Sequence, residues 1–254
     1  MTDQTPALRV TGLSKSYGGL KAMRPIDLVV GDGERVSVIG TNGAGKSTLF
    51  NCIAGTVPAT TGTVSYFGRD ISKMSAAHRA RLGIARTFQT SQLFDQMTAA
   101  QNVYVALGGR EFTGGMLWHV TRDTLRWERV DRLLARVGLA EVHDAIVADL
   151  SHGEQRQLEL AMAFALQPKV LMLDEPAAGF SPAERSRLIQ ILRELPSEVS
   201  LILIEHDMDI ALAVAHRVVV MHDGEKILEG TPDEIRSSER VREIYLGGSL
   251  DDVA

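Results

Sequence analysis

The chain has 254 residues, 44% of them hydrophobic, and a formal net charge of -5. This length suits one α/β domain with an inserted subdomain, and the hydrophobic fraction is that of an ordinary globular protein. The negative charge argues against the basic face by which many proteins bind nucleic acid. Its one cysteine, Cys52, excludes an internal disulfide, and we expect it to pack in a helix rather than to react.

The sequence contains no run of about 18 apolar residues, the length that a membrane-spanning helix needs. Its polar first residues also lack the charged and then apolar pattern of a signal peptide. If the protein works at a membrane, we therefore expect other chains to supply the membrane-spanning part.

Short apolar runs in the first part of the chain predict strands, and Gly31, Asp32 and Gly33 predict a hairpin turn. The strands are expected at residues 8–11, 26–30, 35–39 and 62–67. Between about residues 75 and 150 the apolar residues instead recur with helical spacing, as in Val130 and Leu134. This pattern predicts a helical subdomain, at about residues 89–167, inserted between core strands.

From residue 169 onward, strand and helix patterns alternate again. Fully apolar runs at residues 170–173 and 201–204 are typical of parallel strands that are buried on both faces. Further strands are expected at residues 218–222 and 226–228, and helices at residues 182–195 and 207–215. We predict an α/β fold with a mixed sheet and helices on its faces, whose core comprises about residues 1–88 and 168–254.

The segment between the third predicted strand and a predicted helix contains the complete pattern G-x-x-x-x-G-K-[ST]. Its residues are Gly40, Thr41, Asn42, Gly43, Ala44, Gly45, Lys46, Ser47 and Thr48. Such a loop turns its backbone N–H groups toward phosphate oxygens, and the helix that follows adds a partial positive charge. Lys46 can then reach the β- and γ-phosphates of a nucleotide, and the Ser47 hydroxyl can bind Mg²⁺. The loop alone indicates a P-loop NTPase, a class that includes kinases, GTPases, helicases and transport ATPases.

Two carboxylates, Asp174 and Glu175, follow the apolar run at residues 170–173. Ligands of open α/β sheets bind at the carboxyl ends of the strands. Asp174 is a candidate to hold Mg²⁺, through water, and Glu175 is the candidate general base that polarises an attacking water. The simpler alternative is a strand followed by a solvated acidic turn.

Residues 150–155 read Leu-Ser-His-Gly-Glu-Gln, in which Ser151 and Glu154 have the spacing of a capping box. A helix that starts with a serine hydroxyl beside the small Gly153 can bind an anion. The alternative is only a well-capped amphipathic helix.

This segment resembles the signature of ABC ATPases, usually Leu-Ser-Gly-Gly-Gln, and further motifs match in the order of that family. The resemblance implies that Tyr17 stacks on adenine, that Gln89 is the Q-loop glutamine at Mg²⁺, and that His206 contacts the γ-phosphate. It also implies a P-loop NTPase core with an antiparallel β subdomain, ATP and Mg²⁺ as cofactors, and a head-to-tail dimer. In that dimer, the nucleotide-binding site of one subunit is completed by Ser151, Gly153 and Glu154 of the other subunit.

Some positions depart from the general pattern, because His152 and Glu154 replace Gly and Gln, and Ser181 stands where the D-loop usually has Asp. A signature of this kind is similar to that of ATPases serving importers of branched-chain and other hydrophobic amino acids. The resemblance implies a peripheral protein at the cytoplasmic face of the inner membrane. Its expected partners are permease subunits and a second ATPase subunit, identical or different. Leu93, Phe94 and Met97 are the candidates for permease docking, and the alternative is that they belong to the core of the inserted subdomain. A solute-binding protein is an indirect partner, and no nucleic acid is expected.

Two other functions are compatible with a P-loop. A soluble ABC-type ATPase of DNA repair or translation usually has a long coiled-coil insertion or two cassettes, and this chain has neither. A P-loop kinase would not need the signature or His206.

Overall fold

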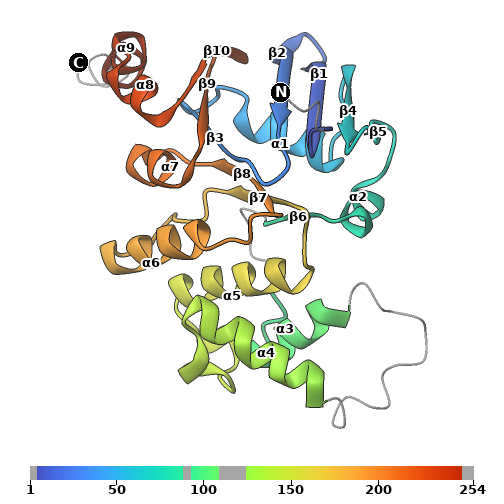
Figure 1. Ribbon diagram of the computed structural model, residues 1–254, viewed down its shortest axis with the longest axis vertical. Coiled ribbons are helices and arrows are strands. Elements are labelled where there is room, and N and C mark those ends of the chain that lie inside the picture. Colours follow the sequence, from blue (N-terminus) through green and yellow to red (C-terminus); the bar gives the residue numbers. More distant parts are fainter. Residues whose placement is uncertain (1–4, 88–92, 109–123, 248–254) are drawn as a thin grey trace. The chain divides into compact units, whose positions relative to one another are not determined.

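The computed structural model describes residues 5–87, 93–108 and 124–247, with the side chains of residues 246 and 247 left out (Figure 1). The chain divides by its internal contacts into two compact units. The first comprises Met1–Ile84, Lys169–Glu175 and Leu195–Ala254, and the second comprises Ala85–Pro168 and Pro176–Glu194.

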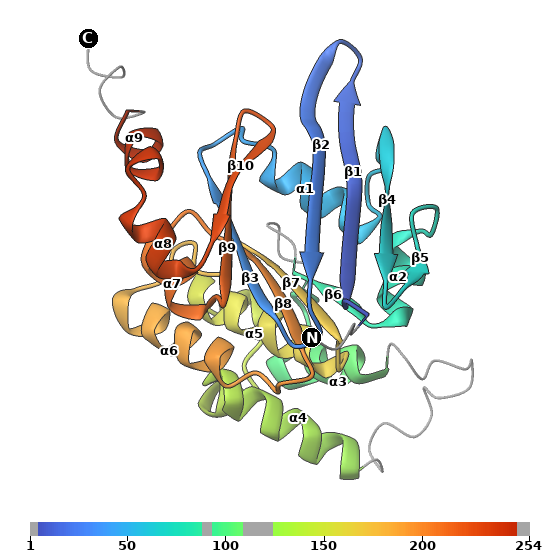
Figure 2. The same ribbon diagram turned by 45° about the horizontal axis from the view of Figure 1, so that its top comes forward.

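An antiparallel sheet of four strands forms one part of the first unit, in the order β2-β1-β4-β5 (Figure 2). Its strands are β1 (Leu8–Tyr17), β2 (Leu20–Val30), β4 (Thr61–Tyr66) and β5 (Arg69–Asp70). Tyr17 pairs with Leu20, so Gly18 and Gly19 form the two-residue turn of a hairpin. The two glycines suit this turn because Gly18 has a φ of 57°, a conformation that disfavours other residues.

The predicted hairpin at Gly31–Gly33 is wrong. The backbone N–H of Glu34 donates to the carbonyl of Gly31 over 3.2 Å, so the chain does turn tightly here. The strands on either side, however, belong to different sheets: β2 pairs with β1, whereas the next strand pairs with β8 and β9. Glycines in a turn predict that the chain changes direction. Tertiary packing determines which strands then pair.

A mixed sheet has the order β10-β9-β3-β8-β7-β6. Its strands are β3 (Arg35–Gly40), β6 (Ile84–Arg86), β7 (Val170–Asp174), β8 (Ser200–Ile204), β9 (Arg217–His222) and β10 (Glu225–Gly230). β3 runs parallel to β8 and β9, β7 runs parallel to β8, and β10 is antiparallel to β9. Every residue of β7 and β8 is buried, as their apolar sequences predict. The predicted α/β fold with a mixed sheet and an antiparallel β part is confirmed.

Helices of the first unit pack on this framework. They are α1 (Lys46–Ala54), α2 (Ala76–Leu82), α7 (Met208–Val214), α8 (Pro232–Ser237) and α9 (Glu239–Gly247). One core cluster includes residues of β1, β2 and α1. Cys52 of α1 belongs to this cluster and is 2% exposed, so it packs in a helix as expected. A smaller cluster joins Ile39 of β3 to residues of α7, β9, α8 and α9.

Helices dominate the second unit, with α3, α4 and α5 packed on one another and α4 in contact with α6 (Figure 1). These elements are α3 (Ala99–Gly108), α4 (Thr124–Val137), α5 (His152–Ala165), α6 (Pro182–Arg193) and the short turns η3 (Ala140–Val142) and η4 (Val147–Asp149). The rings of Tyr104 and Trp127 stack with centroids 4.6 Å apart. In the part of the chain that the structure describes, no helix is both long enough and apolar enough to cross a bilayer.

Candidate nucleotide-binding site

The phosphate loop connects the end of β3 to the first turn of α1, as the sequence predicts. Gly40 ends β3 beside Met221 of β9, and a Cβ built on Gly40 would lie 2.2 Å from the Met221 carbonyl oxygen. Gly45 directly precedes α1 with a φ of 91°. The close approach at Gly40 and the left-handed conformation at Gly45 explain why glycines occupy both positions. The loop thereby brings its N–H groups to the start of a helix, the geometry that binds phosphate.

Lys46 lies inside this loop, with 6% of its surface exposed. Its ammonium donates hydrogen bonds to the carbonyl oxygens of Gly40, at 2.7 Å, and Thr41, at 3.0 Å. Burial lowers the pKa of Lys46, and the negative charges of Glu175 and Asp174 oppose that shift. The loop, the cation and both carboxylates therefore belong to one electrostatic site, where a phosphate can replace the two carbonyl groups as the partner of Lys46.

The end of β9 and the turn between β9 and β10 contact the phosphate loop, and no sequence motif predicts these contacts. The Gly224 N–H donates to the Ala44 carbonyl over 3.2 Å, and the Thr41 hydroxyl lies 3.3 Å from Nδ1 of His222. The buried hydroxyl of Tyr245 in α9 also lies near the backbone of Gly40. Burial raises the pKa of Tyr245 to about 12, and the Gly40 backbone offsets part of that rise.

Asp174 and Glu175 lie where β7 ends. Asp174 is 2% exposed and is level with Ile204, the last residue of the neighbouring strand β8. Glu175 has a φ of 50°, and its N–H donates to the Ile204 carbonyl over 2.9 Å. A glutamate in the left-handed region costs on the order of 1 kcal/mol, and such residues cluster at functional sites. The backbone therefore turns sharply after Asp174 and directs Glu175 away from the buried strand.

His206 follows β8 and faces Glu175. Its Nδ1 lies 4.0 Å from Oε2 of Glu175 and 3.9 Å from Oε2 of Glu205, which is fully buried. The Asp207 carboxylate caps α7 by accepting from the N–H groups of Asp209, at 3.0 Å, and Ile210, at 3.3 Å. The imidazole is 58% exposed and the Glu175 carboxylate 28% exposed, so both can reach a bound ligand.

The oxygen groups of this site fit Mg²⁺ bound together with phosphates. Among the described residues, no group of three or more His, Cys, Asp or Glu side chains could hold a metal ion alone. Mg²⁺ at nucleotide sites needs only one or two carboxylates, because substrate phosphates and water complete its octahedron. The Ser47 hydroxyl on the first turn of α1 and the Asp174 carboxylate are oxygen groups of that type. Gln89, the third predicted metal ligand, lies outside the described residues.

Tyr17 ends β1 directly before the hairpin turn and is 48% exposed. The ammonium of Lys15 lies 4.8 Å from the centroid of its ring. The ring is therefore accessible to a planar ligand such as adenine, and its predicted stacking role stays a prediction.

In the second unit, the predicted capping box at the start of α5 is confirmed. Oε2 of Glu154 accepts from the Ser151 N–H, at 2.8 Å, and from the Ser151 hydroxyl, at 2.7 Å. The Glu154 N–H in turn donates to the Ser151 oxygen over 3.3 Å. Ser181 and Glu184 form the same arrangement at the start of α6. Ser151 is exposed, so a ligand from another molecule can reach it, and that ligand would compete with Glu154 for the two donors of Ser151.

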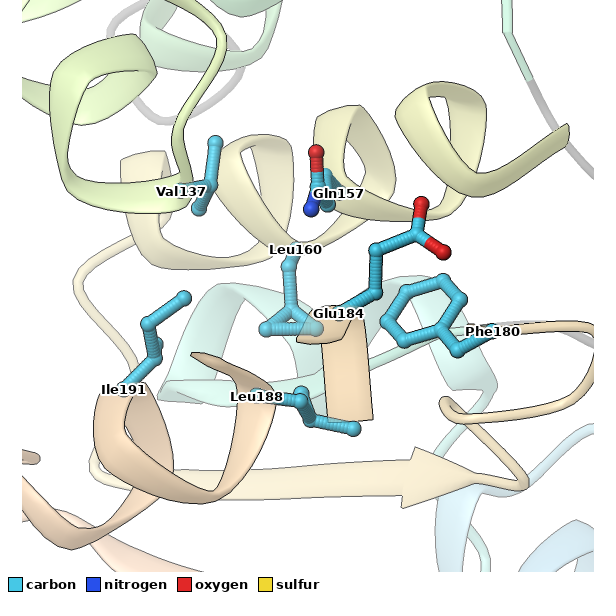
Figure 3. A pocket seen from close by; sticks show the side chains of 7 residues that line it. All are labelled: Val137, Gln157, Leu160, Phe180, Glu184, Leu188 and Ile191. Atoms are coloured by element: carbon cyan, nitrogen blue, oxygen red, sulfur yellow. The ribbon is translucent and has the colours of Figure 1, made fainter. Parts of the chain in front are cut away.

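A cavity of about 10 Å³ lies between α5 and α6 (Figure 3). Its lining consists of Val137, Gln157, Leu160, Phe180, Glu184, Leu188 and Ile191. This volume corresponds to about one water molecule at most, so the cavity is a packing gap and not a ligand site.

Comparison with known protein families gives two matches. The family described as ABC transporter matches residues 23–178, and the family described as branched-chain amino acid ATP-binding cassette transporter matches residues 225–251.

Individual relatives match almost the whole chain. The high-affinity branched-chain amino acid transport ATP-binding protein LivG of Salmonella typhimurium is 39% identical over 250 residues, covering 95% of this chain and 98% of that protein. Its counterpart BraF of Pseudomonas aeruginosa is 38% identical with the same coverage. The crystal structure of an ATP-binding cassette of an ABC transporter in its ADP conformation superimposes with a TM-score of 0.82 at 30% identity, covering 95% of this chain and 99% of the other.

Proposed function

Because this chain belongs to the family of ATP-binding subunits of ABC transporters and is an ATPase, we propose that it powers an importer of branched-chain or other hydrophobic amino acids. The observation that carries this proposal is the match of residues 225–251 to the branched-chain amino acid cassette family. LivG and BraF, relatives that match 95% of the chain, support the same class of solute. The departures from the general signature at His152 and Glu154 point in that direction as well.

ATP would be held by the phosphate loop, with Lys46 at its β- and γ-phosphates. Glu175 acts as the general base that takes a proton from the attacking water, and His206 contacts the γ-phosphate. Their 4.0 Å separation allows one water or phosphate oxygen to meet both side chains. Mg²⁺, when bound, neutralises the developing charge on the phosphates, and Ser47, Asp174 and Gln89 are its proposed ligands.

Two such subunits would form a head-to-tail dimer with two nucleotides between them. Tyr17 stacks on adenine, and Ser151, Gly153 and Glu154 of the opposite subunit complete the phosphate site. The dipole of α5 favours an anion at the N-terminus of this helix. ATP would stabilise the closed dimer through its higher affinity for that state, and hydrolysis would reopen it. The second subunit is either an identical chain or a different ATPase.

Permease subunits would dock on the second unit, near residues 93–97. Phe94 is 48% exposed and Met97 is 37% exposed, whereas Leu93 is partly buried. Exposed apolar side chains of this size favour an interface over a role in the core. The described helices at residues 99–165 would then act as the helical subdomain that transmits ATP binding to the membrane. The proposed location is peripheral, at the cytoplasmic face of the inner membrane, with a solute-binding protein as an indirect partner.

Uptake of labelled leucine, isoleucine and valine tests the proposed solute class. Cells that lack this chain should lose uptake, and the wild-type chain should restore it while Glu175→Gln should not. If uptake of all three amino acids is unaffected by the loss of the chain, the proposed solute class is wrong. A chain that never copurifies with integral membrane subunits after detergent extraction would contradict the transporter role itself.

A further inference from the structure

Glu184 belongs to α6 but also contacts the first turn of α5, in the same compact unit. A Cβ built on Gly153 would lie 2.1 Å from Oε1 and 3.1 Å from Cδ of Glu184. Figure 3 shows the Glu184 side chain extending from α6 toward α5, beside Phe180. Any side chain at position 153 would therefore force the Glu184 carboxylate to move.

The position of this carboxylate is fixed by the cap of its own helix. Its Oε2 accepts from the Ser181 N–H, at 2.7 Å, and from the Ser181 hydroxyl, at 2.6 Å. The Glu184 N–H donates back to the Ser181 oxygen over 3.4 Å. The hydrogen bonds from the side chain and backbone of Ser181 lower the pKa of Glu184, which keeps the group charged at neutral pH. The negative charge therefore lies in the first turn of α6, where the helix dipole favours it, and close to Gly153 in the first turn of α5.

The backbone of Gly153 does not itself require glycine. The residue lies in α5 and lacks the positive φ that Gly43 and Gly45 show in the phosphate loop. In a helix, alanine is normally more stable than glycine. Within this unit, the contact with Glu184 disfavours a side chain at position 153 as long as the cap of α6 holds the carboxylate in place.

We infer that Glu184 is a positioning residue whose carboxylate holds the start of α5 against the start of α6, so that Ser151 and Ser181 keep a fixed relative position. Its functional consequence rests on the proposed dimer, in which Ser151 faces the nucleotide of the partner subunit. Loss of the carboxylate would misplace Ser151 and leave the phosphate loop, which belongs to the other unit, unchanged.

A double-mutant cycle on the nucleotide-free protein tests the contact. Gly153→Ala should lower the unfolding midpoint by roughly 5 °C, because the new methyl group collides with Glu184. The same substitution in a Glu184→Ala background should cost little, because the obstacle is gone. Glu234→Ala is the matched control, since it removes the same kind of capping box with Thr231 from α8 and should leave the cost of Gly153→Ala unchanged. An equal cost with and without Glu184 would refute the contact.

ATP-driven dimerisation tests the functional role, in a Glu175→Gln background and by sedimentation. Glu184→Ala should weaken dimerisation about tenfold, a typical coupling between touching residues, and leave the ATP affinity of the monomer unchanged. Glu184→Gln retains the shape and an acceptor oxygen and should dimerise like the parent. Normal dimerisation of Glu184→Ala would overturn the positioning role. If the Glu175→Gln parent itself fails to dimerise with ATP, the proposed dimer and the role of Glu184 in it are wrong, while the stability cycle still decides the contact.

Discussion

Glu175 and His206 face each other from the ends of two neighbouring parallel strands, with Oε2 of the first 4.0 Å from Nδ1 of the second. The hydrogen bond from the Glu175 N–H to Ile204, two residues before His206, ties the two strand ends together. The strained φ of 50° at Glu175 directs its side chain out of β7 and toward the imidazole. Adjacent strands in a parallel sheet thus place the proposed base and the proposed phosphate-contacting group side by side, although they lie far apart in the sequence.

Replacing Glu175 by Gln should separate ATP binding from hydrolysis. The proposed holders of the phosphates are the loop and Lys46, which this substitution leaves intact, so we expect the affinity for ATP to be retained. Removal of the base should lower the hydrolysis rate by about 10²- to 10⁴-fold, the usual contribution of general-base catalysis, and ATP should then trap a dimer. Phosphate release and sedimentation measure the two effects. Glu225→Gln, an exposed carboxylate of the same unit, is the control, and normal turnover of Glu175→Gln would exclude Glu175 as the base.

Gly40→Ala should disrupt the phosphate loop for a steric reason. The new Cβ would lie 2.2 Å from the Met221 carbonyl oxygen, so β3 and β9 would have to move apart. We expect the free energy of unfolding to fall by about 1–3 kcal/mol, as for other overpacked sites, and ATP binding to be lost. Urea unfolding and nucleotide titration measure these changes. Gly19→Ala has open space around its Cβ and should behave like the wild type; equal stability of both variants would contradict the close approach at Gly40.

Local features of the sequence predict much of this structure. The phosphate loop, the capping box of Ser151 and the buried strand β7 each follow from residues that are adjacent in the chain. Contacts between residues that are distant in the sequence cannot be predicted in this way. The support of the loop by His222 and the contact of Gly153 with Glu184 depend on tertiary packing. The same limit explains the wrong hairpin at residues 31–33, where the turn is present and the strands on either side pair in different sheets.

The caps of α6 and α8 should make the stability of the protein depend on pH in the acid range. Hydrogen bonds from Ser181 lower the pKa of Glu184, and those from Thr231 lower the pKa of Glu234, relative to the ordinary value of 4.5. A carboxyl group with a lowered pKa in the folded state stabilises the fold above its unfolded pKa, and that stability is lost as pH falls through the folded pKa. The free energy of unfolding should therefore fall with decreasing pH below about 4.5.

Chemical unfolding between pH 7 and pH 3 measures this dependence. The double variant Ser181→Ala with Thr231→Ala removes the hydroxyl groups that hold both carboxylates, so its stability should change less over the same interval. If the wild type and the double variant lose stability in parallel, other carboxylates cause the acid dependence.

Phe94 should be needed for assembly with the membrane subunits and not for the fold. Asn102 is fully buried and fixes the backbone at this point: its Oδ1 accepts from the Phe94 N–H at 2.8 Å, and its Nδ2 donates to the Phe94 carbonyl at 3.2 Å. The aromatic side chain nevertheless remains 48% exposed. Buried hydrogen bonds thus fix the backbone of Phe94 while its ring stays exposed. This arrangement is expected of a residue that contacts another protein.

Phe94→Asp should therefore leave thermal stability and the ATP affinity of the isolated subunit unchanged, because the ring contributes little to the core. Copurification with the permease subunits after detergent extraction should fall at least tenfold, since interface aromatic residues often contribute 2 kcal/mol or more, roughly, to binding. Leu125→Asp is the matched control, because Leu125 is 74% exposed on α4 and is not part of the proposed docking segment. Undiminished copurification of Phe94→Asp would place the permease contact elsewhere on the subunit, whereas a comparable loss in Leu125→Asp would show that any charge on this unit disturbs assembly.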